Sequence, residues 1–170
     1  ENVIGALVLN DAIKPEAKET MEELEYLGIQ KVMFTGDNLE IAKKVAGEVG
    51  INEVKAEMLP TDKFDELEKI IKNKKSGNVA FVGDGINDAI ALVKATIGVS
   101  INEGCDIAID SSSVVLMNNN IKNILDLIEI SQQSFKIIKQ NLFWAFFYNS
   151  CMIPIAMGLF KEYGLFINPM

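Results

Sequence analysis

The sequence has no histidine and no arginine, and it contains only two cysteines. Without histidine there is no histidine general base and no imidazole ligand for a metal. All 16 basic residues are lysines, so a phosphate contact must use lysine ammonium groups, hydroxyls or backbone amides. Cys105 and Cys151 lie in different contexts and have no spacing typical of a zinc site or a disulfide scaffold. The net charge of −8 argues against a nucleic-acid partner.

The chain also lacks an initiator methionine and a signal-peptide pattern. We therefore expect it to begin inside a longer protein. Its 170 residues are enough for one modest core, so a single soluble domain with an appendage is the simplest expectation.

Apolar runs and helical periodicities alternate along the first 120 residues. Predicted strands cover residues 3–9, 31–34, 54–58, 79–82, 96–101 and 113–117. Predicted helices cover residues 15–27, 39–49, about 62–71 and 86–94. Thr61 or Asp62 is expected to cap the third helix, with Pro60 outside it. This alternation at short intervals predicts an α/β fold with a parallel sheet and helices on both faces.

The stretch Phe81–Asp88 is the most informative part of this pattern. It leaves a buried strand through Gly83 and Gly85, so its acidic residues lie where open α/β sheets bind ligands. Asp84 and Asp88 are hard oxygen ligands that suit Mg²⁺, with Asn87 between them. The alternative is a plain strand–turn–helix in which Gly85 has a positive φ and Asn87 or Asp88 caps the helix.

Two further polar clusters follow other predicted strands. Thr35-Gly36-Asp37 comes directly after one strand, and Lys63 lies in the first turn of a helix. If the strands are parallel and adjacent, a hydroxyl, an ammonium and a carboxylate-held Mg²⁺ converge on one phosphoryl group. Taken singly, these residues also fit an ordinary turn and an ordinary surface lysine.

The pattern changes after residue 120. Residues 121–141 predict an amphipathic helix, and residues 142–160 contain no charged side chain. A helix over that second range is roughly 28 Å long, close to the thickness of a bilayer core, and predicts a transmembrane segment. A buried core helix is the alternative. Lys136 and Lys139 precede the segment and Trp144 lies near its start, which places the soluble part in the cytoplasm.

These motifs resemble a known family. The stretches Val32–Asn38, Leu59–Lys63 and Val82–Ala89 are similar to the phosphorylation domain of P-type ATPases, which has a haloacid-dehalogenase-like fold. Asp11–Ala17 resembles the segment that re-enters this domain after the nucleotide-binding domain. Three later stretches resemble the heavy-metal-transporting branch of the family: Gln140–Phe146, Tyr148-Asn149 and Ile153–Gly158.

The resemblance implies a role for each matching residue in the phosphoryl site. Thr35 would contact the transferred phosphoryl group, while Gly36 and Asp37 would shape the nucleotide side. Lys63 would stabilise the charge of the phosphate. The cofactors implied are Mg²⁺ and, as substrate of the parent protein, ATP.

The resemblance also assigns metal-related roles. Asp84 would ligate Mg²⁺, and Asn87 and Asp88 would support the phosphate and metal shell. Tyr148-Asn149 matches a pair that copper(I)-type members use in the transport path. From the residues alone, an intramembrane asparagine is a functional candidate or makes a packing hydrogen bond between helices.

No Asp-Lys-Thr-Gly occurs, although in this family that motif carries the phosphorylated aspartate. The chain alone should therefore be inactive and should lack the middle strand of its sheet. The expected parts are the phosphorylation domain over 1–120, the connecting helix over 121–141, the membrane helix over 142–160 and an extracytoplasmic turn with the start of the next membrane segment over 161–170.

The leading hypothesis is part of an ATP-driven Cu(I) export pump, an integral membrane protein. Its expected partners are membrane lipid, the transported ion, and the missing nucleotide-binding, actuator and membrane segments of the same protein. The alternatives are a truncated, membrane-anchored module without turnover and a soluble phosphatase of the same superfamily. The second alternative does not explain residues 142–160.

Overall fold

The computed structural model describes residues 12–73, 77–84, 87–101 and 106–158. The chain divides into two units, residues 1–125 and 126–170. The helices of the first unit are α1 (Pro15–Tyr26), α2 (Leu39–Val49), α3 (Pro60–Lys72), α4 (Ala89–Lys94), α5 (Asp106–Ser111) and the 3-10 helix η1 (Met117–Asn119). Its strands are β1 (Val32–Phe34), β2 (Glu53–Lys55), β3 (Ala80–Gly83), β4 (Ile97–Ser100) and β5 (Val114–Val115). The predicted α/β alternation is therefore confirmed for the described residues.

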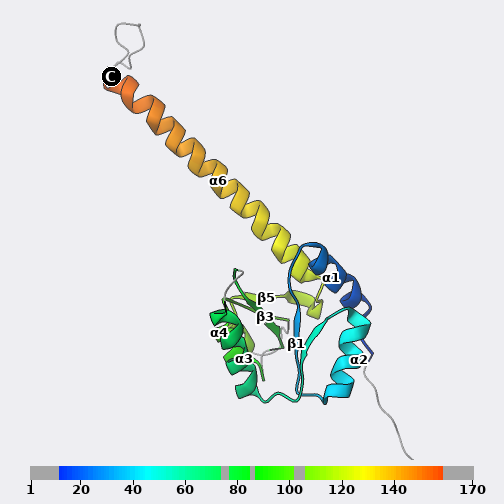
Figure 1. The fold of residues 1–170 in the computed structure, drawn as a ribbon. Coiled ribbons are helices and arrows are strands. Elements are labelled where there is room, and N and C mark those ends of the chain that lie inside the picture. Colours follow the sequence, from blue (N-terminus) through cyan, green and yellow to red (C-terminus); the bar gives the residue numbers. More distant parts are fainter. Residues whose placement is uncertain (1–11, 74–76, 85–86, 102–105, 159–170) are drawn as a thin grey trace, which may run out of the picture. The chain divides into compact units, whose positions relative to one another are not determined.

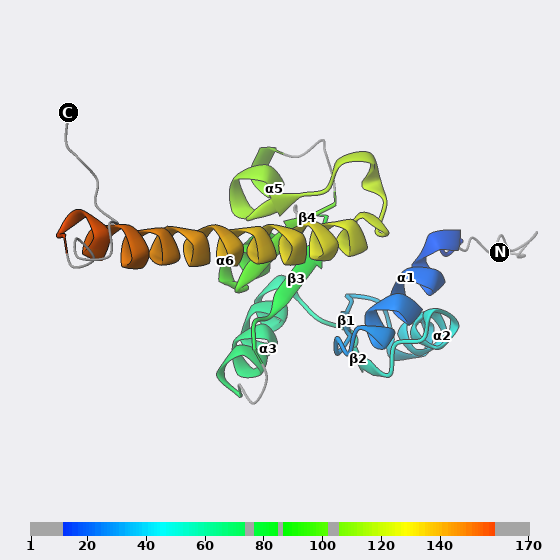
Figure 2. The same ribbon diagram turned by 90° about the horizontal axis from the view of Figure 1, so that it is seen from above.

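The strands form two separate parallel sheets. One pairs β1 with β2, and the other has the order β3-β4-β5. Figures 1 and 2 show α2 beside the first sheet and α3 and α4 beside the second. The rings of Phe34 on β1 and Phe81 on β3 lie 6.1 Å apart, so the two sheets meet through side chains rather than through a hydrogen-bonded ladder. The described strands therefore do not form the one continuous parallel sheet that the alternation predicted.

The core of the second sheet lies between β3, α3 and α4. Leu67, Phe81, Ala91 and Leu92 form its buried cluster, and Phe34 of the first sheet packs against it. Apolar burial of this kind is the main force holding the helices on the sheet. The cluster therefore fixes α3 and α4. Helix α4 directly follows the turn that contains Asp84 and Asp88, which we call the acidic turn.

Sequence reasoning misplaced the beginning of α3. Pro60 is the first residue of the helix, not a residue outside it, and Leu59 occupies the cap position. Proline suits this position because its fixed φ is helical and its missing N–H has no helical partner there. Asp62 supports the helix start by accepting a hydrogen bond from the Leu59 backbone N–H at 2.9 Å.

Other bounds also differ from the prediction. β2 covers Glu53–Lys55 instead of 54–58, because Glu57 has a left-handed φ of 58° and turns the chain back. The acidic turn continues through Asp88, so α4 begins at Ala89 rather than at residue 86. Helices α5 and η1 were not predicted. The strand predicted over 3–9, the conformation of Gly85 and the turn predicted over 161–170 lie outside the described residues.

A charged cluster joins α3 to α4. Glu68 accepts hydrogen bonds from Lys72 at 2.8 Å and from Lys94 at 2.9 Å. These two contacts, that with Lys72 first, lower the pKa of the Glu68 carboxyl from 4.5 to about 2. The ammonium group of Lys94 also lies 5.1 Å from the centre of the Phe64 ring.

Replacing Glu68 by Gln should change how stability responds to acid. Because the pKa of Glu68 is lower in the folded chain, its contribution is present above pH 4.5 and is lost as the pH falls toward 2. The variant should be less stable at neutral pH and should lose less stability over that interval. Urea unfolding midpoints measured across the interval test this. Glu22→Gln, in an exposed pair with an N–O distance of 4.0 Å, should leave the acid dependence unchanged.

The described part of the second unit is essentially one helix, α6 (Asn123–Ala156), which contains Pro154. The helix runs through the predicted connecting segment and most of residues 142–160. Among the described residues, no helix is both long and apolar enough to cross a membrane. The predicted span therefore remains a prediction, and residues 159–160 at its end lie outside the described part.

Candidate functional site

An ion pair brings two of the predicted site residues together. The Nζ atom of Lys63, on α3, lies 2.7 Å from Oδ1 of Asp88, in the turn before α4. Each side chain is only 13% exposed. The two residues are 25 positions apart, so the fold of the second sheet and its helices creates this contact.

The position of Asp88 depends on Gly83 at the end of β3. A Cβ atom built on Gly83 would lie 2.7 Å from Oδ2 of Asp88 and 2.9 Å from its Cβ. Any side chain at this position would push the carboxylate away from Lys63. Sequence reasoning did not assign a role to Gly83; the available signal was a glycine directly before the acidic turn.

The capping interpretation of Asp88 is not supported. Asp88 stands at the cap position of α4, but its side chain makes no capping hydrogen bond. Its backbone carbonyl accepts from Leu92 N–H at 2.8 Å, while its carboxylate faces Lys63. The Asp88 side chain is therefore not used to cap α4 and is available for its contact with Lys63.

Asp84 and Asn87 are exposed on either side of the same turn. Asp84 directly follows β3, at the carboxyl end of the strand, as predicted. In the part of the chain that the structure describes, no group of three or more Asp, Glu or Cys side chains gathers as a metal cage. An oxygen-only set of one or two carboxylates fits Mg²⁺, which completes its shell with water and phosphate oxygens.

The residues after β1 form a cluster of their own. The Thr35 hydroxyl donates to Oδ2 of Asp37 at 2.9 Å and accepts from the Asp37 backbone N–H at 3.1 Å. Gly36 and Asp37 are exposed. Asn38 accepts a hydrogen bond from Ile41 N–H at 2.9 Å and so caps α2. The backbone N–H of Met58 donates to the Thr35 carbonyl at 3.1 Å, which ties this turn to the segment after β2.

The structure thus holds the residues predicted for a phosphoryl site in two clusters. One contains Thr35 with Asp37, and the other contains Lys63 with Asp88. Within the described ranges, no hydrogen bond or ion pair connects the clusters. The ring contact between Phe34 and Phe81 links the strands that lead to them.

Tyr148 and Asn149 are exposed neighbours on α6. Pro154 lies further along the same helix and cannot donate a backbone hydrogen bond to the Ser150 carbonyl. The helix is therefore locally loosened one residue after Asn149. Cys151 is a free, exposed cysteine on the same turn.

The chain is similar to several known proteins. A family model described as a haloacid dehalogenase-like hydrolase matches residues 1–96. The copper-exporting P-type ATPase B of Archaeoglobus fulgidus is 37% identical over 167 residues, covering 98% of this chain and 24% of that protein. The protein of the same name from Enterococcus hirae is 42% identical over 169 residues, covering 99% and 22%.

A solved structure is also similar. The crystal structure of a zinc-transporting PIB-type ATPase in its E2.Pi state has a TM-score of 0.78 and 32% identity to this chain. The match covers 91% of this chain and 24% of that protein. The chain thus spans about a quarter of the length of the proteins it matches.

Proposed function

Because the chain belongs to the haloacid dehalogenase-like hydrolase family, we propose that it is part of a heavy-metal P-type ATPase. It would supply the carboxyl-terminal part of the phosphorylation domain over 1–120, the connecting helix over 121–141 and a membrane helix over 142–160. The observation that carries the proposal is the 2.7 Å pair of Lys63 and Asp88 at the end of the strand that leads to Asp84. Similarity to copper-exporting P-type ATPases over nearly the whole chain supports it.

In this proposal the residues of the strand ends handle one phosphoryl group. Lys63 neutralises charge on the phosphoryl oxygens, and Thr35 contacts the group once its hydroxyl leaves Asp37. Asp84 and Asp88 would hold Mg²⁺, which neutralises charge on the transferred group when bound. Asn87 supports that shell.

The proposed reaction also needs a nucleotide and a nucleophile, which the residues above do not provide. Gly36 and Asp37 form the nucleotide side of the site. The aspartate that accepts phosphate from ATP belongs to an Asp-Lys-Thr-Gly sequence that this chain does not contain. We therefore expect the chain by itself to be inactive, since phosphoryl transfer to an enzyme needs its nucleophile.

The membrane part of the proposal rests on residues 142–160, which carry no charged side chain and begin in the continuous helix α6. The protein would be an integral membrane protein with residues 1–141 in the cytoplasm and an extracytoplasmic turn within 161–170. Tyr148-Asn149 would lie on the path of the transported ion. Because no charged residue lies within the span and the curated relatives export copper, Cu(I) is the favoured ion.

Replacing Asp84 by Asn in the full-length protein tests this function. The variant loses a carboxylate for Mg²⁺, so we expect the Mg²⁺ concentration for half-maximal phosphoenzyme formation to rise at least tenfold. Removing a supporting partner of a metal site already lowers affinity roughly 10- to 100-fold. Phosphoenzyme is measured from labelled ATP at graded Mg²⁺. Asp65→Asn, the same change at an exposed position on α3, is the matched control. Unchanged phosphoenzyme at limiting Mg²⁺ would contradict the role of Asp84.

A further inference from the structure

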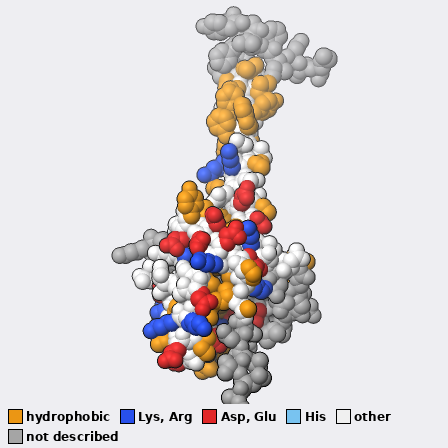
Figure 3. Space-filling model, turned by 90° about the vertical axis from the view of Figure 1, so that its right-hand side faces the viewer, with side chains coloured by type: hydrophobic (Ala, Val, Ile, Leu, Met, Phe, Trp, Pro, Cys, Tyr) orange, Lys and Arg blue, Asp and Glu red, His pale blue; other side chains and the backbone are white. Residues whose placement is uncertain are grey.

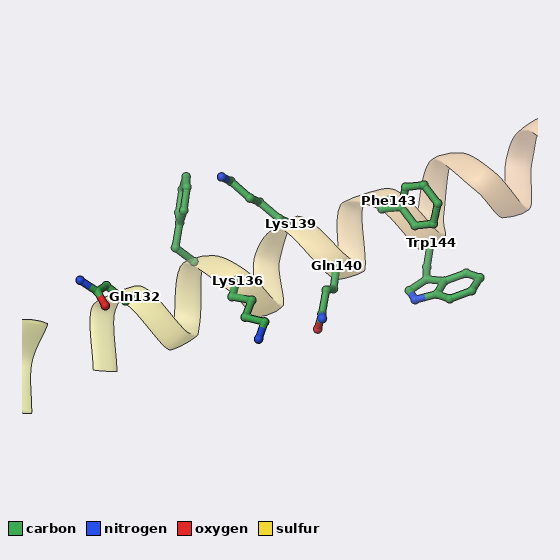
Figure 4. Close-up of a pocket in the computed structure, with 7 residues that line it drawn as sticks. Gln132, Lys136, Lys139, Gln140, Phe143 and Trp144 are labelled. Carbon is green, nitrogen blue, oxygen red and sulfur yellow. The ribbon is translucent and has the colours of Figure 1, made fainter. Parts of the chain in front are cut away.

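Helix α6 carries a shallow groove that the proposed pump chemistry does not use. Its volume is about 410 Å³, and it lies between two rows of side chains with four-residue spacing. Such spacing places side chains above one another on one helix face. The rows are Lys136, Gln140 and Trp144, and Phe135, Lys139 and Phe143. Figure 4 shows Lys136, Gln140 and Trp144 on one side of the helix and Lys139 and Phe143 on the other.

In both rows a lysine is followed by an aromatic ring toward the carboxyl end, and in the second row Phe135 also precedes the lysine. Phe143 follows Lys139 by four residues, about 6 Å along the axis, and Trp144 follows Lys136 by eight, about 12 Å. The ring of Trp144 meets Phe143 edge-on at 5.5 Å and Phe147 at 5.8 Å. The groove therefore has a cationic end and an aromatic end. Figure 3 shows hydrophobic side chains gathered along α6 beyond its lysines.

The cationic end has no anionic partner among the described residues. Neither Lys136 nor Lys139 makes a salt bridge there, and the Lys139 ammonium group lies 4.7 Å from the centre of the Phe135 ring. The acidic side chains of α6, Asp126 and Glu129, precede Lys136 by about two turns or more. The groove thus carries two exposed positive charges beside exposed aromatic rings.

We propose that this groove binds the headgroup phosphate of an anionic phospholipid. Lys136 and Lys139 contact the phosphate, and Phe143 and Trp144 lie at the boundary with the acyl chains. Charge complementarity selects an anion, and the adjoining rings favour an anion that continues into an apolar chain over free phosphate. The inference rests on the membrane segment proposed over 142–160.

The chain contains a single tryptophan, Trp144, so its fluorescence reports on this groove. The 170-residue chain is reconstituted into phosphatidylcholine vesicles that contain phosphatidylglycerol, with one of the two lipids brominated to quench tryptophan. We expect brominated phosphatidylglycerol to quench Trp144 more than its share of the bilayer predicts. Each lysine near an anionic surface should favour phosphatidylglycerol over phosphatidylcholine about fivefold. The preference should fall as salt is added.

The combined variant Lys136→Gln and Lys139→Gln should reduce the preference to that of a random mixture. The matched control is Lys43→Gln with Lys44→Gln, which removes two exposed lysines of α2 that make no salt bridge within the described residues. This control should keep the preference. Circular dichroism establishes that both variants retain their helix content.

Three results would overturn the proposed lipid site, and they differ in what they imply for the membrane segment. Equal quenching by the two lipids means that the membrane segment is correct and the lipid site is wrong. Absence of quenching in a chain that floats with the vesicles means that protein, such as a second helix, covers the groove. A chain that does not float with vesicles of either composition refutes the membrane segment as well.

Discussion

Replacing Lys63 by Met should lower the free energy of unfolding by about 3 kcal/mol. The variant leaves the Asp88 carboxylate, which is 13% exposed, without the ammonium group that lies 2.7 Å away. A largely buried charge without its partner keeps the cost of desolvation and loses the attraction that offset it. Urea unfolding of the 170-residue chain measures the change.

A double-mutant cycle shows whether this loss of stability comes from the interaction between Lys63 and Asp88. Lys63→Met, Asp88→Asn and the combined variant should give a coupling of about 1–3 kcal/mol. Lys55→Met is the control, because its pair with Glu66 has an N–O distance of 3.1 Å and the lysine is 38% exposed. We expect this control to lose much less stability than Lys63→Met, because solvent screens the exposed pair. If the losses of unfolding free energy caused by Lys63→Met and Asp88→Asn simply add, the two side chains do not stabilise each other and the prediction is wrong.

In the full-length protein the same lysine substitution should also slow the chemical step. If Lys63 neutralises the phosphoryl oxygens, its loss should slow phosphoenzyme formation roughly 100-fold or more. Lys55→Met should form phosphoenzyme at the normal rate. A Lys63→Met protein that is destabilised yet phosphorylated normally would assign the pair a purely structural role.

The helix bounds that sequence reasoning predicted well are those with local signals. Helix α2 was predicted at its observed limits, because Asn38 caps its start and Gly50 ends it with a φ of 79°. Helix α5 has six residues and was missed. A helix this short has too few turns for a periodic apolar pattern to stand out.

The site could be predicted in outline for a different reason. The order of the motifs predicted that Lys63 lies near the acidic turn if the strands are parallel and adjacent. The strands form two sheets, and the packing of α3 against α4 brings Lys63 to Asp88. The direction of each side chain depends on packing that no local signal contains. The Thr35 hydroxyl bonds to Asp37 within its own turn, and Gly83 leaves the space that the Asp88 carboxylate occupies. Both facts come only from the folded structure.

Among the glycines that the structure describes, Gly98 is the one whose replacement by Ala should produce the largest loss of stability. A Cβ atom built on Gly98, in β4, would clash with the Leu92 carbonyl oxygen and lie 3.0 Å from the Leu92 carbonyl carbon. The atom that the new Cβ would meet belongs to the backbone of α4, and Leu92 is only 1% exposed. Neither β4 nor α4 can therefore shift without disturbing the packed core. Overpacking of a close-packed core costs about 3 kcal/mol in such a case. Thermal and urea unfolding measure the loss.

Gly47→Ala is the opposite case and the matched control. Gly47 lies within α2, and a Cβ atom there meets nothing within 4 Å. Alanine should therefore stabilise the helix by about 0.5–1 kcal/mol. Equal effects of the two substitutions would show that backbone freedom, not the contact between β4 and α4, governs both positions.

The Gly98 substitution also tests how the core positions the polar site. Asp88 directly precedes α4, so a helix forced away from β4 should carry this carboxylate away from Lys63. In a Gly98→Ala background, Lys63→Met should then cost less than it does in the unchanged chain. An undiminished cost would mean that the turn holds Asp88 in place independently of the helix.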